Sequence, residues 1–272
     1  MKQKFYTFNE TQLLEAPKIP LTVMADNQTV FEAIALEMVD EIEKNNHKDK
    51  NTVFIVPVGP VGQYPYFVSM VNARGIDLKK VWFINMDEYL DDNKMWINID
   101  NKLSFRGFME REVYSKIDKE LVMPSEQRVF PDPLNLDYIP NLIQELGGVD
   151  IAFGGIGING HVAFNEPKEE LSGEEFLQLK TRVEDIAQET RAVNSVGDLN
   201  GALDEMPHYC VTIGMYEISR ARKIRLGCFR DWHRSVIRHA AYGEKSAHFP
   251  VTLLQGHPDI NIKLTDFVAK LP

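Results

Sequence analysis

A histidine and a glutamate stand close together in residues 155–167, which read GIGINGHVAFNEP. His161 and Glu166 are five positions apart, and the apolar residues 162–164 between them should draw the loop inward. An imidazole beside a carboxylate is suited to proton transfer, because histidine exchanges its proton near neutral pH. The alternative, a surface histidine beside a solvated glutamate, is disfavoured by those apolar residues. We therefore interpret His161 and Glu166 as an acid–base pair.

The same segment matches G-x-G-x-x-G over residues 155–160, a pattern found in dinucleotide-binding turns. Such a turn must start a helix whose first N–H groups face the pyrophosphate. Here Pro167 follows seven residues after Gly160 and disfavours the helical conformation at the residue before it. The acidic strand end expected about 20 residues later is also missing, because residues 169–189 form a charged run. The sequence therefore predicts that no NAD binds here.

Apolar runs alternate with segments of helical spacing along the chain. The expected strands are residues 52–58, 81–86, 149–154, 209–213, 223–229 and 259–264. The expected helices are residues 30–45, 64–73, 105–114, 138–146 and 234–242. Several strands are apolar along their whole length, as buried parallel strands are. This alternation predicts a three-layer α/β/α sandwich with a mostly parallel, Rossmann-like sheet, in a single domain over residues 1–272.

Three of the expected strands are followed by residues that could do chemistry. Gly59 follows the first of them, Asp87 and Glu88 follow the second, and the His161 loop follows the third. In parallel sheets, ligands bind beyond the carboxyl ends of the strands. Each loop alone could be ordinary turn chemistry, with carboxylates capping helices and glycines turning the chain. Together they predict a catalytic pocket at this edge.

The composition narrows the class of protein. The chain has 272 residues, a net charge of −10 and no basic stripe, which argues against nucleic acid and anionic membranes as partners. Its two cysteines, Cys210 and Cys228, lie in apolar runs and indicate buried thiols rather than disulfides. No apolar run is long enough to span a membrane. We expect a cytoplasmic protein with a small-molecule ligand, and a homo-oligomer stays open.

Two motifs resemble signatures of the glucosamine-6-phosphate deaminases, which are related to the 6-phosphogluconolactonases. Residues 159–167, NGHVAFNEP, resemble the family's D-G-H-I-A-F-N-E-P, and residues 85–89 match its N-M-D-E-Y. Thr190-Arg191 and Asn194-Ser195 match a T-R-x-x-N-S segment, and residues 209–214, YCVTIG, are similar to Y-A-L-T-V-G. The A-F-N-E-P ending favours the deaminase branch over the lactonases.

The resemblance implies an aldose–ketose isomerisation coupled to loss of ammonia from an amino sugar, without a metal or an organic cofactor. Asp87 falls on the aspartate that moves the C2 proton. His161 falls on the histidine that opens the sugar ring, and Glu166 falls on its carboxylate partner. Candidate substrate-binding residues are Gly59, Glu88, Gly160, Arg191, Arg230, His233 and Arg234.

The sequence departs from the family pattern at several of these positions. Asn159, which we keep among the catalytic candidates, replaces the family's aspartate, and an amide cannot accept a proton in that role. The first loop, VGPV over residues 58–61, lacks hydroxyl groups, Val196 replaces an arginine and His233 replaces a lysine. Arg230 and Arg234 are near enough to substitute. The regulatory arginine–lysine pair of allosteric members reads Arg182 and Glu184 here, which argues against that regulation.

Three functions stay open on the sequence. The first is a deaminase and isomerase acting on an amino sugar or its phosphate, which the joint presence of Asp87, His161 and Glu166 favours. The second is a non-catalytic sugar-binding protein, either a sensor or a pseudoenzyme. The third and weakest is a hydrolase of the 6-phosphogluconolactonase type, because hydrolysis does not need Asp87 as an isomerase base.

Overall fold

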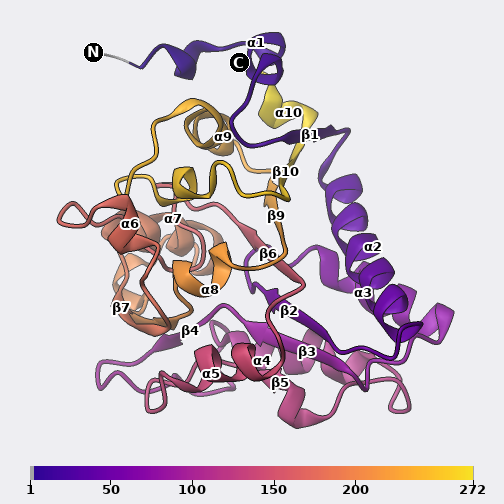
Figure 1. Ribbon diagram of the computed structural model, residues 1–272. Coiled ribbons are helices and arrows are strands. Elements are labelled where there is room, and N and C mark those ends of the chain that lie inside the picture. Colours follow the sequence, from indigo (N-terminus) through magenta and orange to yellow (C-terminus); the bar gives the residue numbers. More distant parts are fainter. Residues whose placement is uncertain (1–2, 272) are drawn as a thin grey trace.

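Two β-sheets organise residues 3–271, the part of the chain that the computed structural model describes (Figure 1). Residues 1, 2 and 272 of the predicted 1–272 domain lie outside it. All paired strands of the larger sheet are parallel, in the order β1 (Leu21–Met24), β10 (Ile260–Thr265), β9 (Lys223–Cys228), β6 (Ile151–Gly155), β2 (Thr52–Val56), β3 (Val81–Asn85) and β5 (Arg128–Val129). The smaller sheet is antiparallel, in the order β4 (Asp87–Leu90), β8 (Tyr209–Thr212) and β7 (Arg182–Asp185).

Helices cover both faces of the larger sheet. Side chains alternate along a strand, so Phe54 and Val56 of β2 pack with α2 (Asn27–Asn46), α3 (Gln63–Arg74) and α4 (Phe105–Glu112). Val53 and Ile55 point to the other face, toward α5 (Tyr138–Glu145), α8 (Met215–Ser219) and α9 (His233–Tyr242). The predicted three-layer α/β/α sandwich with a parallel sheet is therefore confirmed.

The remaining helices are short or lie beside the smaller sheet. They are α1 (Glu10–Glu15), α6 (Gly173–Phe176), α7 (Gln188–Asp198), α10 (Asp266–Ala269) and 3₁₀ turns at Lys4–Thr7, Tyr114–Lys116, Ser125–Gln127, Leu203–Glu205 and Pro250–Leu254. Figure 1 shows both chain ends at the same end of the molecule, near α9. Within residues 3–271, every helix is too short or too polar to cross a membrane.

Three details of the sequence interpretation were wrong. Asp87 does not begin a loop but is the first residue of β4, because the chain passes from one sheet to the other at Met86. The segment expected as a strand at residues 209–213 is β8, which pairs antiparallel with β4 and β7 rather than joining the parallel sheet. The charged run 169–189 contains β7, whose buried Glu184 is neutralised by Arg182 and Lys168.

Candidate active site

A cavity of about 740 Å³ lies at the carboxyl edge of the larger sheet. Parallel strands end at the same edge, so the segments after β2, β3, β6 and β9 all reach the cavity wall. β2 and β6 are neighbours, and from them the chain proceeds outward in opposite directions, to β3 and to β9. Such a switch point is where open parallel sheets bind ligands.

His161 is fixed in this wall through one side of its ring. Its Nδ1 lies 2.8 Å from Asn159 Oδ1, 3.2 Å from Glu166 Oε2 and 3.3 Å from Thr190 Oγ1. The ring lies flat over Gly157, where a Cβ would come within 2.1 Å of Nε2. Any larger residue at position 157 would therefore displace the imidazole.

The loop that carries His161 turns through left-handed backbone conformations. Gly160 has φ 84°, and a Cβ there would lie 2.5 Å from the Phe249 ring. Ala163 has φ 55°, which is unusual for a residue with a side chain. Buried Val162 and Asn165 anchor the turn, since the Asn165 amide donates to the carbonyls of Val162 and Ile213. No helix follows until α6, in keeping with the prediction that residues 155–160 do not form a dinucleotide turn.

Glu166 is almost fully buried behind His161, with 3% of its surface exposed. Burial alone would raise the pKa of Glu166, but the charge of His161 and hydrogen bonds from His161, Asn159 and Thr190 outweigh it and lower that pKa. Its Oε1 has no hydrogen-bond partner among residues 3–271. Glu166 is therefore held as a carboxylate directly beside Nδ1 of His161.

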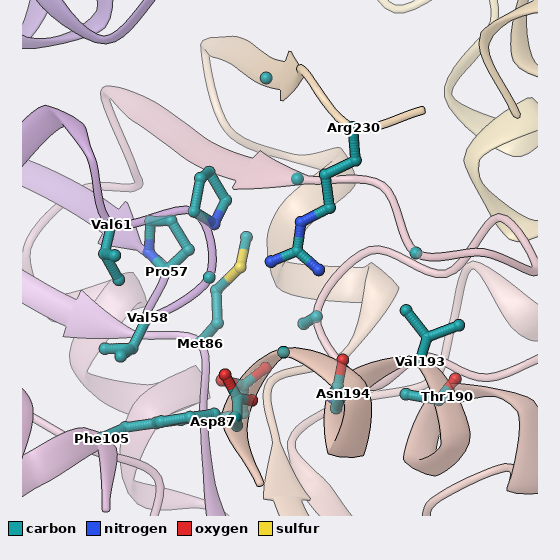
Figure 2. A pocket seen from close by; sticks show the side chains of 18 of the residues that line it. Pro57, Val58, Val61, Met86, Asp87, Phe105, Thr190, Val193, Asn194 and Arg230 are labelled. Atoms are coloured by element: carbon teal, nitrogen blue, oxygen red, sulfur yellow. The ribbon is translucent and has the colours of Figure 1, made fainter. Parts of the chain in front are cut away.

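Asp87 faces the cavity from the first position of β4 (Figure 2). No side chain or backbone group of residues 3–271 donates a hydrogen bond to its carboxyl group, whose surroundings include Met86 and Phe105. Burial, and then the charge of Glu88, raise the pKa of Asp87 well above its usual range. A carboxyl group in this state is a stronger base once ionised, because water and protein donors do not stabilise its charge.

Two cations, Arg230 and Lys102, line the same cavity. Figure 2 shows the Arg230 guanidinium extending into it toward the side where Asp87 and Asn194 lie. Arg230 makes no ion pair within 4 Å in the described chain, whereas Lys102 donates to the Asp198 carbonyl at 2.9 Å. Burial raises the pKa of Asp198, and the charges of Arg230 and Lys102 oppose that rise. These two cations are therefore positioned to attract an anion.

The first loop of the cavity is apolar, as its sequence indicates. Val58, Gly59 and Val61 line it, and Figure 2 shows both valines with Pro57 on one wall. The side-chain donors nearby are already engaged, because Gln63 donates to the Pro60 carbonyl at 2.9 Å and Tyr64 donates to the Pro57 carbonyl. This wall offers few donors to a charged ligand.

Comparison with known proteins places this geometry in context. No protein-family model matches the chain. A glucosamine-6-phosphate deaminase of Clostridium perfringens is 29% identical over 258 residues, 92% of this chain and 98% of that protein. One from Mycoplasma mycoides is 28% identical, covering 88% of this chain and 92% of its own length. Over most of its length, the chain is therefore similar to glucosamine-6-phosphate deaminases.

Solved structures agree with this relationship at the level of the fold. A monomeric glucosamine-6-phosphate deaminase superposes with a TM-score of 0.80 at 21% identity, covering 92% of this chain and 99% of its own. A 6-phosphogluconolactonase from Trypanosoma brucei superposes with a TM-score of 0.66 at 15% identity, covering 93% of this chain and 98% of its own. The nearly complete coverage means that this chain shares the fold of both enzymes over most of its length.

The structure brings some candidate binding residues to the cavity and places others elsewhere. Gly59, Arg230 and His233 line it. Gly160 turns the loop beneath it, as described above. Glu88 is fully buried and instead accepts hydrogen bonds from the start of α4, at the N–H groups of Phe105 and Arg106.

Two of the candidate arginines, Arg191 and Arg234, also bind the protein's own backbone rather than facing the cavity. Arg191 donates to the carbonyls of Leu203 and Met206, and Arg234 donates to the Phe267 carbonyl. Their donors are therefore directed at backbone away from the cavity. Arg182 and Glu184 form an ion pair at 2.6 Å.

His233 lines the cavity but is a neutral structural residue. Its Nδ1 accepts from the backbone N–H groups of Phe229 and Arg230 at 2.8 Å, so Nε2 must carry the proton and donate to the Ile156 carbonyl at 3.0 Å. Burial lowers the pKa of His233 to about 3, and the charge of Arg230 adds to this effect. His233 therefore cannot replace a lysine as a cation near neutral pH.

The sequence analysis matched Thr190 and Asn194 of α7 to a family segment but selected neither as a site residue. Thr190, Val193, Asn194 and Gly197 line the cavity from one face of this helix. Val193, Asn194 and Gly197 lie three, four and seven positions after Thr190, a spacing that indicates one face of a helix. The polar and charged residues between them obscured this pattern in the sequence. Lys102 was also missed, because it lies in a polar segment without periodicity.

Proposed function

We propose that this chain is an aldose–ketose isomerase and deaminase acting on an amino sugar phosphate of the glucosamine-6-phosphate kind. The observation that carries the proposal is that Asp87 and His161, from separate elements, line the same cavity. Both relatives described above are named for this reaction. We also propose that residues 1–272 work as one catalytic domain.

His161 would open the sugar ring. In the cyclic substrate, the C1 hydroxyl proton must leave while the ring oxygen gains a proton, so that the C1–O5 bond breaks and an aldehyde forms. Asn159, Glu166 and Thr190 all contact the His161 ring at Nδ1. This leaves Nε2 for the substrate. The Glu166 carboxylate would support the imidazolium that carries the proton between the two oxygens.

Asp87 would then move a proton from C2 to C1. Removing the C2 proton gives an enolamine, and returning it at C1 gives a 2-imine, which water hydrolyses to the ketose and ammonia. A carboxylate with few donors around it suits the abstraction of a weakly acidic C–H proton. The lack of hydrogen bonds to Asp87 in the described chain supports this role, as does its raised pKa.

The phosphate would be held by Arg230 and Lys102 rather than by the first loop. A phosphate in a cavity needs several donors to offset its lost hydration. Residues 58–61 supply few, whereas Arg230 offers a planar fork without a competing carboxylate within 4 Å. Asp198 is the opposing charge nearby, and the two cations outnumber it.

A substrate panel tests the proposal. Ammonia release and C2 deuterium exchange are measured with glucosamine-6-phosphate, glucosamine and galactosamine-6-phosphate, and lactone hydrolysis is measured with 6-phosphogluconolactone. We expect ammonia release and exchange with a phosphorylated amino sugar only. Tight binding without exchange would instead favour a sugar-binding protein, and lactone hydrolysis alone would favour the hydrolase.

We place this reaction in the cytoplasm. Cys210 and Cys228 are both free and buried, and burial raises the pKa of both thiols, so they are protonated and unreactive. Unpaired thiols fit a reducing compartment.

A further inference from the structure

Asn159 joins two carboxylates to His161. Its amide nitrogen donates to Glu166 Oε2 at 2.7 Å and to Glu189 Oε1 at 3.0 Å. Its amide oxygen lies 2.8 Å from His161 Nδ1. Glu189 comes from a different element, the first turn of α7, and is exposed to solvent. The side chain of Asn159 thus connects the catalytic loop with α7 and uses both amide hydrogens.

The orientation of this amide determines where the imidazole proton lies. If the amide were flipped, its oxygen would face two carboxylates and both amide hydrogens would lose their acceptors. In the observed orientation, the oxygen faces Nδ1 and can only accept, so Nδ1 must carry a proton. Nε2 therefore presents its lone pair to the cavity when the imidazole is neutral.

We propose that Glu189 is a positioning residue that acts on His161 through the Asn159 amide. Its negative charge polarises the amide, which makes the amide oxygen a better acceptor for Nδ1–H and stabilises the imidazolium. Glu189 and Asn159 together then do what a carboxylate at position 159 would do by direct contact. This inference rests on the proposed function only for its effect on turnover.

A carboxylate at position 159 would conflict with the same surroundings. It would place a negative charge within about 3 Å of both Glu166 and Glu189, where the amide now donates. Like charges so close cannot all remain ionised. The amide at position 159 and the carboxylate at position 189 are therefore a matched pair, and changing one calls for a change in the other.

A charge-swap series tests this pairing. The variants are Glu189→Gln, Asn159→Asp and the double variant Asn159→Asp/Glu189→Gln. The matched control is Glu170→Gln, because Glu170 is exposed and its side chain makes no hydrogen bond or ion pair within residues 3–271. We expect Glu189→Gln to lower kcat about 3- to 10-fold and Asn159→Asp to lower it further. The double variant should recover at least about 5-fold over Asn159→Asp, because it has one carboxylate fewer.

The state of His161 gives a test that needs no turnover. In ¹⁵N-labelled protein, with signals assigned through His161→Gln, we expect neutral His161 to carry its proton on Nδ1. Glu189→Gln should lower the titration midpoint of His161, because it removes the negative charge that the Asn159 amide connects to the ring. Glu166 beside the ring and Asp87 in the same cavity are unchanged in this variant.

The outcomes separate this inference from the proposed function. An Nδ1–H tautomer and a lowered midpoint in a protein without deaminase activity would uphold the Glu189 link and reject the proposed reaction. An unchanged midpoint in Glu189→Gln, or an Asn159→Asp variant as active as the double variant, would overturn the link even if ammonia is released.

Discussion

Asp87 and His161 line the same cavity in opposite surroundings. Nδ1 of His161 lies within 3.3 Å of three polar side chains, one of which is the buried carboxylate of Glu166. The carboxyl group of Asp87 receives no hydrogen bond from residues 3–271, and burial with a neighbouring negative charge raises its pKa. The His161 imidazole is therefore surrounded by partners that stabilise its charged form, whereas the Asp87 carboxyl group lacks such partners.

This difference fits two kinds of proton transfer. A group that carries a proton between two oxygens must pass through a charged state, so a network that stabilises that state helps it. A base that removes a proton from carbon gains strength when its charge is poorly solvated. The same fold supplies both environments because the two side chains follow different strands, one in a polar loop and one at the junction of two sheets.

Replacing Asp87 should have the largest effect. Asp87→Asn keeps the shape of the side chain and removes the base, so turnover should fall by about 10⁴-fold and C2 deuterium exchange should vanish. Substrate affinity, measured by calorimetry, should change little. Asp92→Asn serves as the control, because Asp92 is exposed beyond the other end of β4. Exchange that persists in Asp87→Asn would identify a different base.

Replacing His161 should cost less, because the sugar ring also opens slowly without help. His161→Gln is expected to lower kcat by about 10²–10³-fold. The matched control is His248→Gln, whose side chain is exposed. Full activity of His161→Gln on a cyclic substrate would remove ring opening from the role of His161.

Replacing the two cations that would bind the phosphate, Arg230 and Lys102, should change KM rather than kcat. Arg230→Ala and Lys102→Ala should each raise KM for the phosphorylated sugar by about 10- to 100-fold, since each removes a charged donor to the phosphate. Arg234→Ala is the matched control, because its guanidinium faces the Phe267 carbonyl and Asp231. Equal losses for phosphorylated and unphosphorylated sugars would show that the two cations hold something other than phosphate.

Much of this site could be predicted from sequence because local signals agree there. His161 and Glu166 share one short loop, so their spacing already limits how far apart they can lie. The central strands were also predictable, because burial on both faces leaves continuous apolar runs. Asp87 was correctly assigned to the strand edge, although as a loop residue.

The sequence could not predict which side chains from distant segments contact each other. Glu189 meets Asn159 across 30 positions, and nothing local to either residue indicates the contact. The same holds for Glu88, whose carboxylate looks like a site residue until the start of α4 is seen to donate to it. Residue type alone does not show whether a polar side chain faces a ligand or stabilises the fold. The tertiary contacts are needed to distinguish the two.

His233 provides the finest test of the comparison, because it is a second histidine at the cavity whose Nδ1 has partners of the opposite kind. Nδ1 of His233 accepts two backbone N–H groups, whereas Nδ1 of His161 faces the Asn159 amide oxygen. His233 has a pKa of about 3 in the folded protein and about 6.5 when unfolded, so the unfolded chain binds the extra proton between these values. Its contribution to stability is therefore fully present above about pH 6.5 and is lost as the pH falls toward 3.

His233→Asn should keep an acceptor for the Phe229 and Arg230 N–H groups while removing the titration. We expect KM for the phosphorylated sugar to change by less than about 3-fold, and its pH dependence from 5.5 to 8 to run parallel to that of the native protein. The substrate phosphate itself titrates near pH 6, so the ratio of the two profiles is the quantity to measure. A flat ratio means that His233 stays neutral. A step in that ratio near pH 6.5 would mean that His233 carries charge in the complex, and the phosphate grip would then include it beside Arg230.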